Sequence, residues 1–215
     1  MKKERRFVPV DDIEVRVSGD GRKIEGLVTP FNKWTNIGGM FRERIMPGAF
    51  TDTIANDDIR ALFNHDPNLV LGRTTNGSYR LSEEKRGLFG SISPPGTQVA
   101  NDVVTLVDGE FVTGQSFGFI VKEDKWQTKE IDGVPTEHRT ITGVQMFDGG
   151  PVTFPQYKET DAVMRSAEDV YEARMADINE EPSETVVDDE GEDDATRVAR
   201  ESQSRQRKLA LLSHK

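Results

Sequence analysis

The chain has 215 residues, enough for one domain with appendages or for two small domains. It contains no cysteine, which excludes disulfides, thiolate metal sites and a cysteine nucleophile. A net charge of −10 argues against a general nucleic-acid-binding surface, and no apolar run approaches the roughly 20 residues needed to span a bilayer. We therefore expect a cytosolic protein that binds neither nucleic acid nor membrane.

The charge is unevenly distributed along the chain. Residues 161–215 carry fifteen acidic and eight basic side chains, a net of −7, whereas residues 1–160 contribute only −3. This asymmetry predicts a near-neutral body over 1–160 and an acidic tail over 161–215.

Short strands dominate the body. Residues 13–17, IEVRV, alternate apolar and charged side chains, as a strand with one wet face does. Two segments, 47–57 and 97–110, instead place apolar residues at helical spacing. The further strand candidates, separated by Gly, Pro, Asn or Asp, are 58–64, 69–73, 77–82, 87–93, 112–124, 137–147 and 151–154. The spacing of these strands predicts a mainly β protein with a few helices, built as a barrel or a sandwich.

The tail changes character along its length. Residues 161–181 can form a helix, although its apolar stripe is thin. Beyond about residue 180 the charge is dense and large apolar groups are few, so burial cannot offset the entropy of ordering. We expect roughly 180–215 to be disordered in isolation.

One strand candidate carries a serine between glycines, in GQSFGF (114–119). Alternation along a strand places Phe117 and Phe119 on one face and Ser116, flanked by Gly114 and Gly118, on the other. The missing side chains leave room beside the hydroxyl for an imidazole and a substrate backbone. Glycine inside a strand often marks such a close approach.

A serine nucleophile needs a general base, which is most often histidine, and a third group that orients the imidazole. The body holds two histidines, His65 and His138. His65 is the better candidate because it ends the apolar run IRALFNHD just before a proline turn, which presents its ring at a rim. These residues indicate a serine hydrolase; metal binding by His65 with Asp66 is a weaker alternative because no second ligand cluster is spaced for it.

Five segments together extend this reading. They are IEGLVTPFNKW, ERIMPGAF, IRALFNHDPNLVLGRT, GQSFGF and FDGGPVTFPQY. In order and spacing the chain resembles the prohead (capsid maturation) serine proteases of tailed phages over about residues 10–160. That family is similar to the herpesvirus assemblins, so the resemblance implies a closed β-barrel surrounded by a few helices.

The resemblance also implies roles for particular residues. His65 corresponds to the general base and Ser116 to the nucleophile. Asp148 stands where the family carries a Glu, and we favour it as the orienting acid. The alternates are His138, because assemblins use a second histidine, and then Glu137. The backbone of Gly149 and Gly150 is a candidate for oxyanion stabilisation.

The function implied is a serine endopeptidase without cofactor or metal. It would act inside the assembling procapsid in the host cytoplasm, cleaving a scaffold protein or the scaffolding region of the major capsid protein, and then itself. Its tail would contact these partners and be removed by self-cleavage, and a homodimer is plausible. The alternative is a catalytically silent scaffold or assembly protein that retains the fold.

Overall fold

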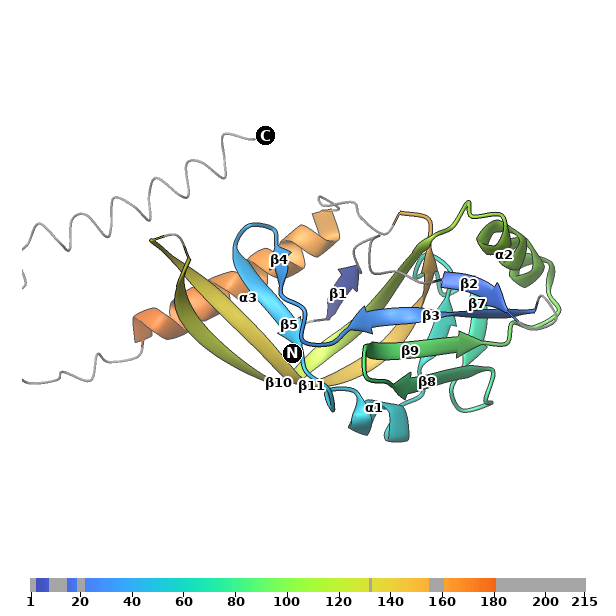
Figure 1. Cartoon of the computed structure of the whole chain (residues 1–215), viewed down its shortest axis with the longest axis horizontal. Coiled ribbons are helices and arrows are strands. Elements are labelled where there is room, and N and C mark those ends of the chain that lie inside the picture. The colour runs from blue at the N-terminus through green and yellow to red at the C-terminus, as the bar shows by residue number, and fades with distance from the viewer. Residues whose placement is uncertain (1–2, 8–14, 19–21, 132, 155–160, 181–215) are drawn as a thin grey trace, which may run out of the picture. The chain divides into compact units, whose positions relative to one another are not determined.

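The computed structural model describes residues 3–7, 15–18, 22–131, 133–154 and 161–180. The chain divides into two compact units, Met1–Asp177 and Ile178–Lys215. Two sheets and three helices make up the described part of the first unit (Figure 1). The mainly β composition with helices agrees with the strand and helix patterns of the sequence.

The larger sheet has seven strands built around a long hairpin. β10 and β11 form this hairpin, β1 lies on the free side of β10, and β5 followed by β4 lies beyond β11. β11 pairs in parallel with β5 through its first half and with β6 near its end, and β7 pairs with β6. The bounds are β1 Glu4–Phe7, β4 Thr35–Ile37, β5 Phe41–Ile45, β6 Arg60–Leu62, β7 Val70–Arg73, β10 Gly114–Ile131 and β11 Val134–Val152.

The smaller sheet is a four-stranded antiparallel sheet in the order β2-β3-β9-β8. Its strands are β2 Val15–Ser18, β3 Lys23–Pro30, β8 Tyr79–Glu83 and β9 Gly87–Ile92. Apolar side chains from both sheets belong to one core, which includes Val28 and Leu88 from the smaller sheet and Phe117 and Phe119 from β10. Burying each of these phenylalanines stabilises the fold by about 1.5–3 kcal/mol.

No closed barrel is found among the described residues, whose strand pairs form two sheets with free ends. β1 and β4 end the main strand order of one sheet, and β2 and β8 end the other. In the larger sheet, β11 pairs with β5 over residues 137–141 and with β6 at 148–149. One edge of this long strand is therefore shared by two partners, and the sheet branches there.

Both helices expected in the body are confirmed. α1 spans Thr51–Asn56, and α2 spans Gln98–Asp108. The side chain of Thr97 caps α2 by accepting a hydrogen bond from the backbone N–H of Ala100 at 3.3 Å, and Gly109 follows its last turn. Polar capping residues of this kind are the start signals that sequence patterns provide.

α3, Asp161–Glu180, packs on the larger sheet through its described side chains up to Asp177. Ala167 is fully buried there, and Tyr171 stacks on Phe41 of β5 at 6.4 Å between ring centroids. Arg174 Nε donates to Glu137 Oε2 at 3.1 Å. Residues 181–215, where the sequence predicts disorder, lie outside the described residues.

Candidate active site

Ser116 stands near the start of β10 and is fully buried. Its strand neighbour Phe117 packs in the core against Phe50 and Phe119, as alternation along the strand predicts. Ser116 is paired with Gly150 of β11 on one side and with Phe7 of β1 on the other. The hydroxyl therefore projects from the middle of a sheet and not from a loop.

His65 follows β6 in a tight loop whose backbone is unusual. Both Asn64 and His65 adopt left-handed conformations, with φ of 52° and 57°. Non-glycine residues hold this conformation at some cost, and such strain clusters at functional sites. The Asn64 side chain fixes the loop to the end of β11, because its amide donates to Thr153 Oγ1 at 3.1 Å and its Oδ1 accepts from the Thr153 N–H at 2.9 Å.

The structure brings three of the predicted site residues into one hydrogen-bonded chain. His65 Nε2 lies 2.6 Å from Ser116 Oγ, and His65 Nδ1 lies 2.9 Å from Asp148 Oδ1. With Asp148 accepting the Nδ1–H, the tautomer leaves Nε2 free to accept the serine proton. The His65 and Asp148 side chains are only 7% and 8% exposed, so these contacts are shielded from water.

Strand pairing positions Asp148 for this contact. β6, which leads directly into the His65 loop, pairs with β11 at Asp148 and Gly149. Gly118 of β10 lies opposite Asp148, and a Cβ on Gly118 would come within 2.5 Å of Asp148 Oδ1. The absence of a side chain at Gly118 thus leaves the space that the Asp148 carboxylate occupies.

We expect Gly118→Ala to disturb this carboxylate. The new methyl group would also meet Phe147 Cε2 at 2.5 Å, and overpacking of this kind costs about 1–3 kcal/mol of stability. If the carboxylate moves away from His65 and the activation barrier rises by about 1.4 kcal/mol or more, hydrolysis by Ser116 should fall by at least about tenfold. Gly96→Ala is a matched control because its nearest atom, Arg22 Nη2, is 3.9 Å away. Equal activity of the two variants would contradict the packing argument.

The two alternates for the third position lie elsewhere in β11. His138 precedes Asp148 by ten residues, roughly 30 Å along an extended strand. Its Nδ1 hydrogen-bonds to the Thr136 carbonyl at 3.0 Å, and its ring packs edge-on against Trp34. Glu137 accepts hydrogen bonds from Thr128 and Arg174. The structure therefore places neither of them beside His65.

The two candidate oxyanion glycines lie in the paired part of β11. Gly149 is opposite Phe117 and Gly150 is opposite Ser116. Gly150 has φ of 154°, and a Cβ there would come within 2.3 Å of the Leu62 carbonyl oxygen. Close packing is thus one reason for glycine at this position, and an oxyanion role stays a prediction.

One buried hydroxyl near the site was not anticipated from the sequence. Tyr79 of β8 is 2% exposed, and its hydroxyl has no hydrogen-bond partner among the described residues. It would lie 3.1 Å from a Cβ on Gly149. Burial, with a smaller contribution from the charge of Asp148, raises the pKa of Tyr79 well above its usual value, so the ring stays neutral.

β1 covers the nucleophile. It pairs antiparallel with β10 so that Arg6 lies opposite Phe117, and Ser116 Oγ is 3.1 Å from the carbonyl oxygen of Arg6. This strand was not expected from the sequence, because residues 4–7 are mostly charged. It explains why Ser116 is fully buried.

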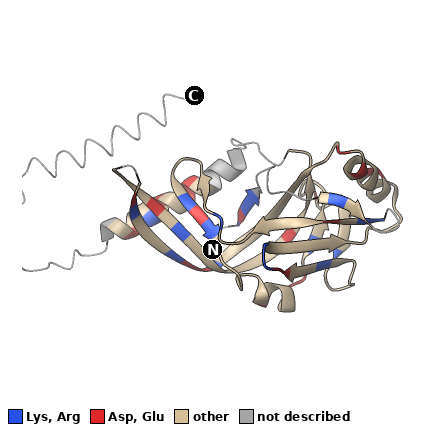
Figure 2. Cartoon of the chain, in the orientation of Figure 1, with Lys and Arg blue, Asp and Glu red and all other residues tan. Residues whose placement is uncertain are grey.

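A buried cluster of charges holds β1 to the sheet. Figure 2 shows acidic and basic positions side by side on β5 and on the hairpin of β10 and β11. Arg6 donates to Glu43 Oε2 at 2.8 Å and to Glu4, and Arg139 Nη1 donates to Glu4 Oε2 at 2.9 Å and to Glu43 Oε2 at 3.2 Å. Arg139 also donates to Asp124 through Nε, at 2.6 Å. We call Glu4, Arg6, Glu43 and Arg139 the charge cluster.

One residue pattern in β5 indicates this cluster from the sequence. In β5, FRERI, Glu43 shares a face with Phe41 and Ile45, which are both buried. A charged residue in the apolar register of a strand is buried only when it is paired, so Glu43 predicts a cationic partner.

The charge cluster should make stability depend on pH. Burial by itself would raise the pKa of Glu43, but Arg6 and Arg139 outweigh it and lower the pKa below 4.5. A carboxyl with a lowered folded-state pKa stabilises the fold above its unfolded pKa, and this contribution is lost as pH falls through the folded value. We expect Glu43→Gln to cost about 3–5 kcal/mol at pH 7, as for other broken buried ion pairs, and progressively less below about pH 4.5.

Denaturant unfolding of wild type and Glu43→Gln at pH 7, 4.5 and 3 measures this difference. Glu123→Gln, an exposed change on β10, should show no comparable gap. A Glu43→Gln gap that stays constant from pH 7 to pH 3 would contradict the pairing.

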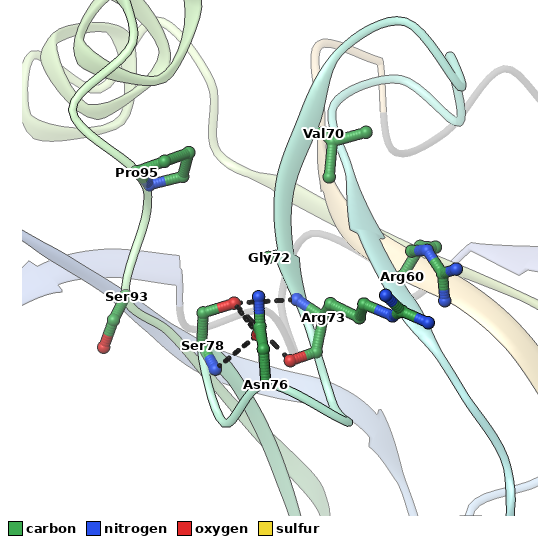
Figure 3. A pocket seen from close by; sticks show the side chains of 8 residues that line it. All are labelled: Arg60, Val70, Gly72, Arg73, Asn76, Ser78, Ser93 and Pro95. Carbon is green, nitrogen blue, oxygen red and sulfur yellow. Dashed lines mark hydrogen bonds between the residues drawn. The ribbon is translucent and has the colours of Figure 1, made fainter.

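Outside these contacts, a surface hollow lies beside β7 (Figure 3). Arg60, Val70, Arg73 and Pro95 are among the residues that line it, and no member of the Ser116–His65–Asp148 chain does. Over the described ranges, no group of three His, Cys, Asp or Glu side chains is arranged to hold a metal ion. None of the helices in that part of the chain is long and apolar enough to cross a membrane.

One known protein family matches most of the chain. Searches of curated proteins and of solved structures find no match to the chain. One protein family matches residues 11–173, which include Ser116, His65 and Asp148, and its description is Caudovirus prohead serine protease. Because the match covers well over half of the sequence, the chain belongs to the Caudovirus prohead serine protease family.

Proposed function

We propose that this chain is a serine endopeptidase that cleaves a scaffold protein or the scaffolding region of the major capsid protein, and itself, during procapsid maturation. The family describes prohead serine proteases, which are peptidases of capsid maturation. The observation that carries the proposal for this chain is the continuous hydrogen-bonded chain from Asp148 through His65 to Ser116.

The geometry supports one role for each of the three side chains. Ser116 attacks the carbonyl carbon of the scissile peptide while His65 Nε2 takes its proton as general base. Asp148 holds the imidazole in the required tautomer and stabilises the imidazolium that forms. His65 then donates the proton to the leaving amine, and water hydrolyses the acyl-enzyme by the same route in reverse.

Mass spectrometry of the chain co-expressed with its capsid protein tests this function. We expect wild type to truncate the capsid or scaffold protein and to shorten itself, whereas Ser116→Ala leaves all chains intact. If both preparations yield the same intact chains and assemble normal shells, the chain is a scaffold or assembly protein that retains the fold.

A further inference from the structure

The strand that covers Ser116 also has the features of a bound substrate. β1 is extended, pairs edge to edge with β10, and presents the carbonyl oxygen of Arg6 to the hydroxyl of Ser116 at 3.1 Å. Addition of an extended peptide to a sheet edge is a common mode of peptide recognition. The Ser116 hydroxyl donates a hydrogen bond to this carbonyl oxygen, so the Arg6 carbonyl group lies directly beside the nucleophile.

We propose that the Arg6–Phe7 bond is a self-cleavage site, and that Glu43 and Arg139 select substrates with a basic residue at the scissile carbonyl and an acidic residue two positions before it. This inference rests on the proposed function, because it assigns a scissile bond and a recognition pocket to the same nucleophile.

Two members of the charge cluster, Glu43 and Arg139, belong to the larger sheet and would form the recognition site. Glu43 of β5 and Arg139 of β11 are opposite each other in the parallel strand pair, and they are only 4% and 5% exposed. Glu43 meets the Arg6 guanidinium through two oxygens, at 2.5 and 2.8 Å from Nε and Nη2. A paired, planar contact of this kind is specific for arginine.

In β1, the residues that contact Glu43 and Arg139 alternate along the strand. Glu4 and Arg6 point to the same face of β1, as strand alternation requires, and both are buried. Arg139 Nη1 contacts both oxygens of Glu4, at 3.1 and 2.9 Å. Arg5, which lies between them, is exposed, so the recognition site does not contact its side chain.

A purely structural strand would not require charges at these positions. Burying four ionised side chains is costly, and apolar residues of similar size serve at least as well where only stability matters. Burial by itself would lower the pKa of Arg6, yet Glu43 and Glu4 raise it above its usual value, so the guanidinium stays charged in this site. The charges therefore make the site selective for the sequence of the strand that it binds.

Cleavage at this bond follows the general scheme. Ser116 Oγ adds to the Arg6 carbonyl carbon as His65 accepts its proton, and the bond to the Phe7 nitrogen breaks as that nitrogen receives the proton. Water then releases residues 1–6 with an Arg6 carboxylate and regenerates the Ser116 hydroxyl. Departure of this segment uncovers Ser116 and leaves Glu43 and Arg139 available to other chains.

Intact-mass analysis of the purified full chain over time tests the site in cis. We expect wild type to lose residues 1–6 and to begin at Phe7, and Ser116→Ala to stay whole at this end. Arg6→Ala should slow this cleavage by roughly 10²-fold or more, as for loss of one partner of a buried charge pair, whereas Arg5→Ala should change it less than about threefold.

A peptide assay with wild-type enzyme changes only the substrate, so the alanine peptides test recognition independently of protein folding. Wild type is given the peptide MKKERRFVPVDD, which is residues 1–12, and its forms with alanine at position 4, 5 or 6. We expect efficient cleavage only where positions 4 and 6 are intact. Glu43→Gln should abolish the discrimination between the unchanged peptide and its Arg6→Ala form, and Glu123→Gln should preserve it.

The outcomes separate this inference from the proposed function. If wild type cleaves a capsid or scaffold protein but never after Arg6, and treats the position 5 and position 6 peptides alike, the inference is overturned while the protease stands. If wild type and Ser116→Ala are indistinguishable on every substrate, the proposed function fails and the inference fails with it.

Discussion

Ser116→Ala should lower peptide hydrolysis by about 10⁶-fold, the loss seen when a triad serine is removed from a serine protease. The reason is that Ser116 Oγ is the hydroxyl 2.6 Å from His65 Nε2, and the chain has no cysteine whose thiol could take over as nucleophile. Turnover of capsid or scaffold protein, followed by gel or mass spectrometry, measures the loss.

The matched control is Ser82→Ala, an exposed serine in β8 that should leave the rate unchanged. Thermal unfolding of Ser116→Ala should stay close to wild type, because only one hydroxyl is removed from a buried position. Retained hydrolysis by folded Ser116→Ala would transfer the nucleophile to another residue and contradict the site.

Asp148→Asn should lower turnover by roughly 10⁴-fold, as the corresponding change does in chymotrypsin-type triads. An asparagine fits the space beside Gly118, but its amide no longer favours the His65 tautomer that accepts a proton at Nε2. The effect should fall on kcat, because Asp148 acts through His65 and not on substrate. Steady-state kinetics on a capsid-derived peptide measures the division between kcat and KM.

His138→Gln is the comparison for this prediction. His138 packs on Trp34 and bonds to the Thr136 carbonyl, so its loss should change kcat less than about threefold. If His138→Gln were the more damaging of the two, the orienting role would belong to His138, as the assemblin pattern suggested.

The His65 and Ser116 candidates could be predicted because each depends on local pattern. A serine between glycines in an apolar strand, and a histidine at a strand end before a proline, are visible within a few residues. α1 and α2 were predictable for the same reason, since apolar spacing and the Thr97 cap are short-range features. Short-range interactions along the chain determine such elements largely without contacts to distant residues.

The third position was not decided by pattern. His138, Glu137 and Asp148 all lie on one strand, and only the resemblance of the segment around Asp148 to the family favoured it over the other two. The choice depends on where β6 pairs with β11, because that register carries the His65 loop to Asp148. Strand register between segments about 90 residues apart is a property of the assembled sheet.

The sequence by itself determined the family, the mainly β composition, and two residues able to form a nucleophile and its base. Tertiary structure alone decided that the sheets stay open, that Asp148 meets His65, and that β1 lies over Ser116 with its charges buried against Glu43 and Arg139. The physical reason is that pairing between distant strands and mutual burial of opposite charges depend on three-dimensional neighbours, which residue spacing does not specify.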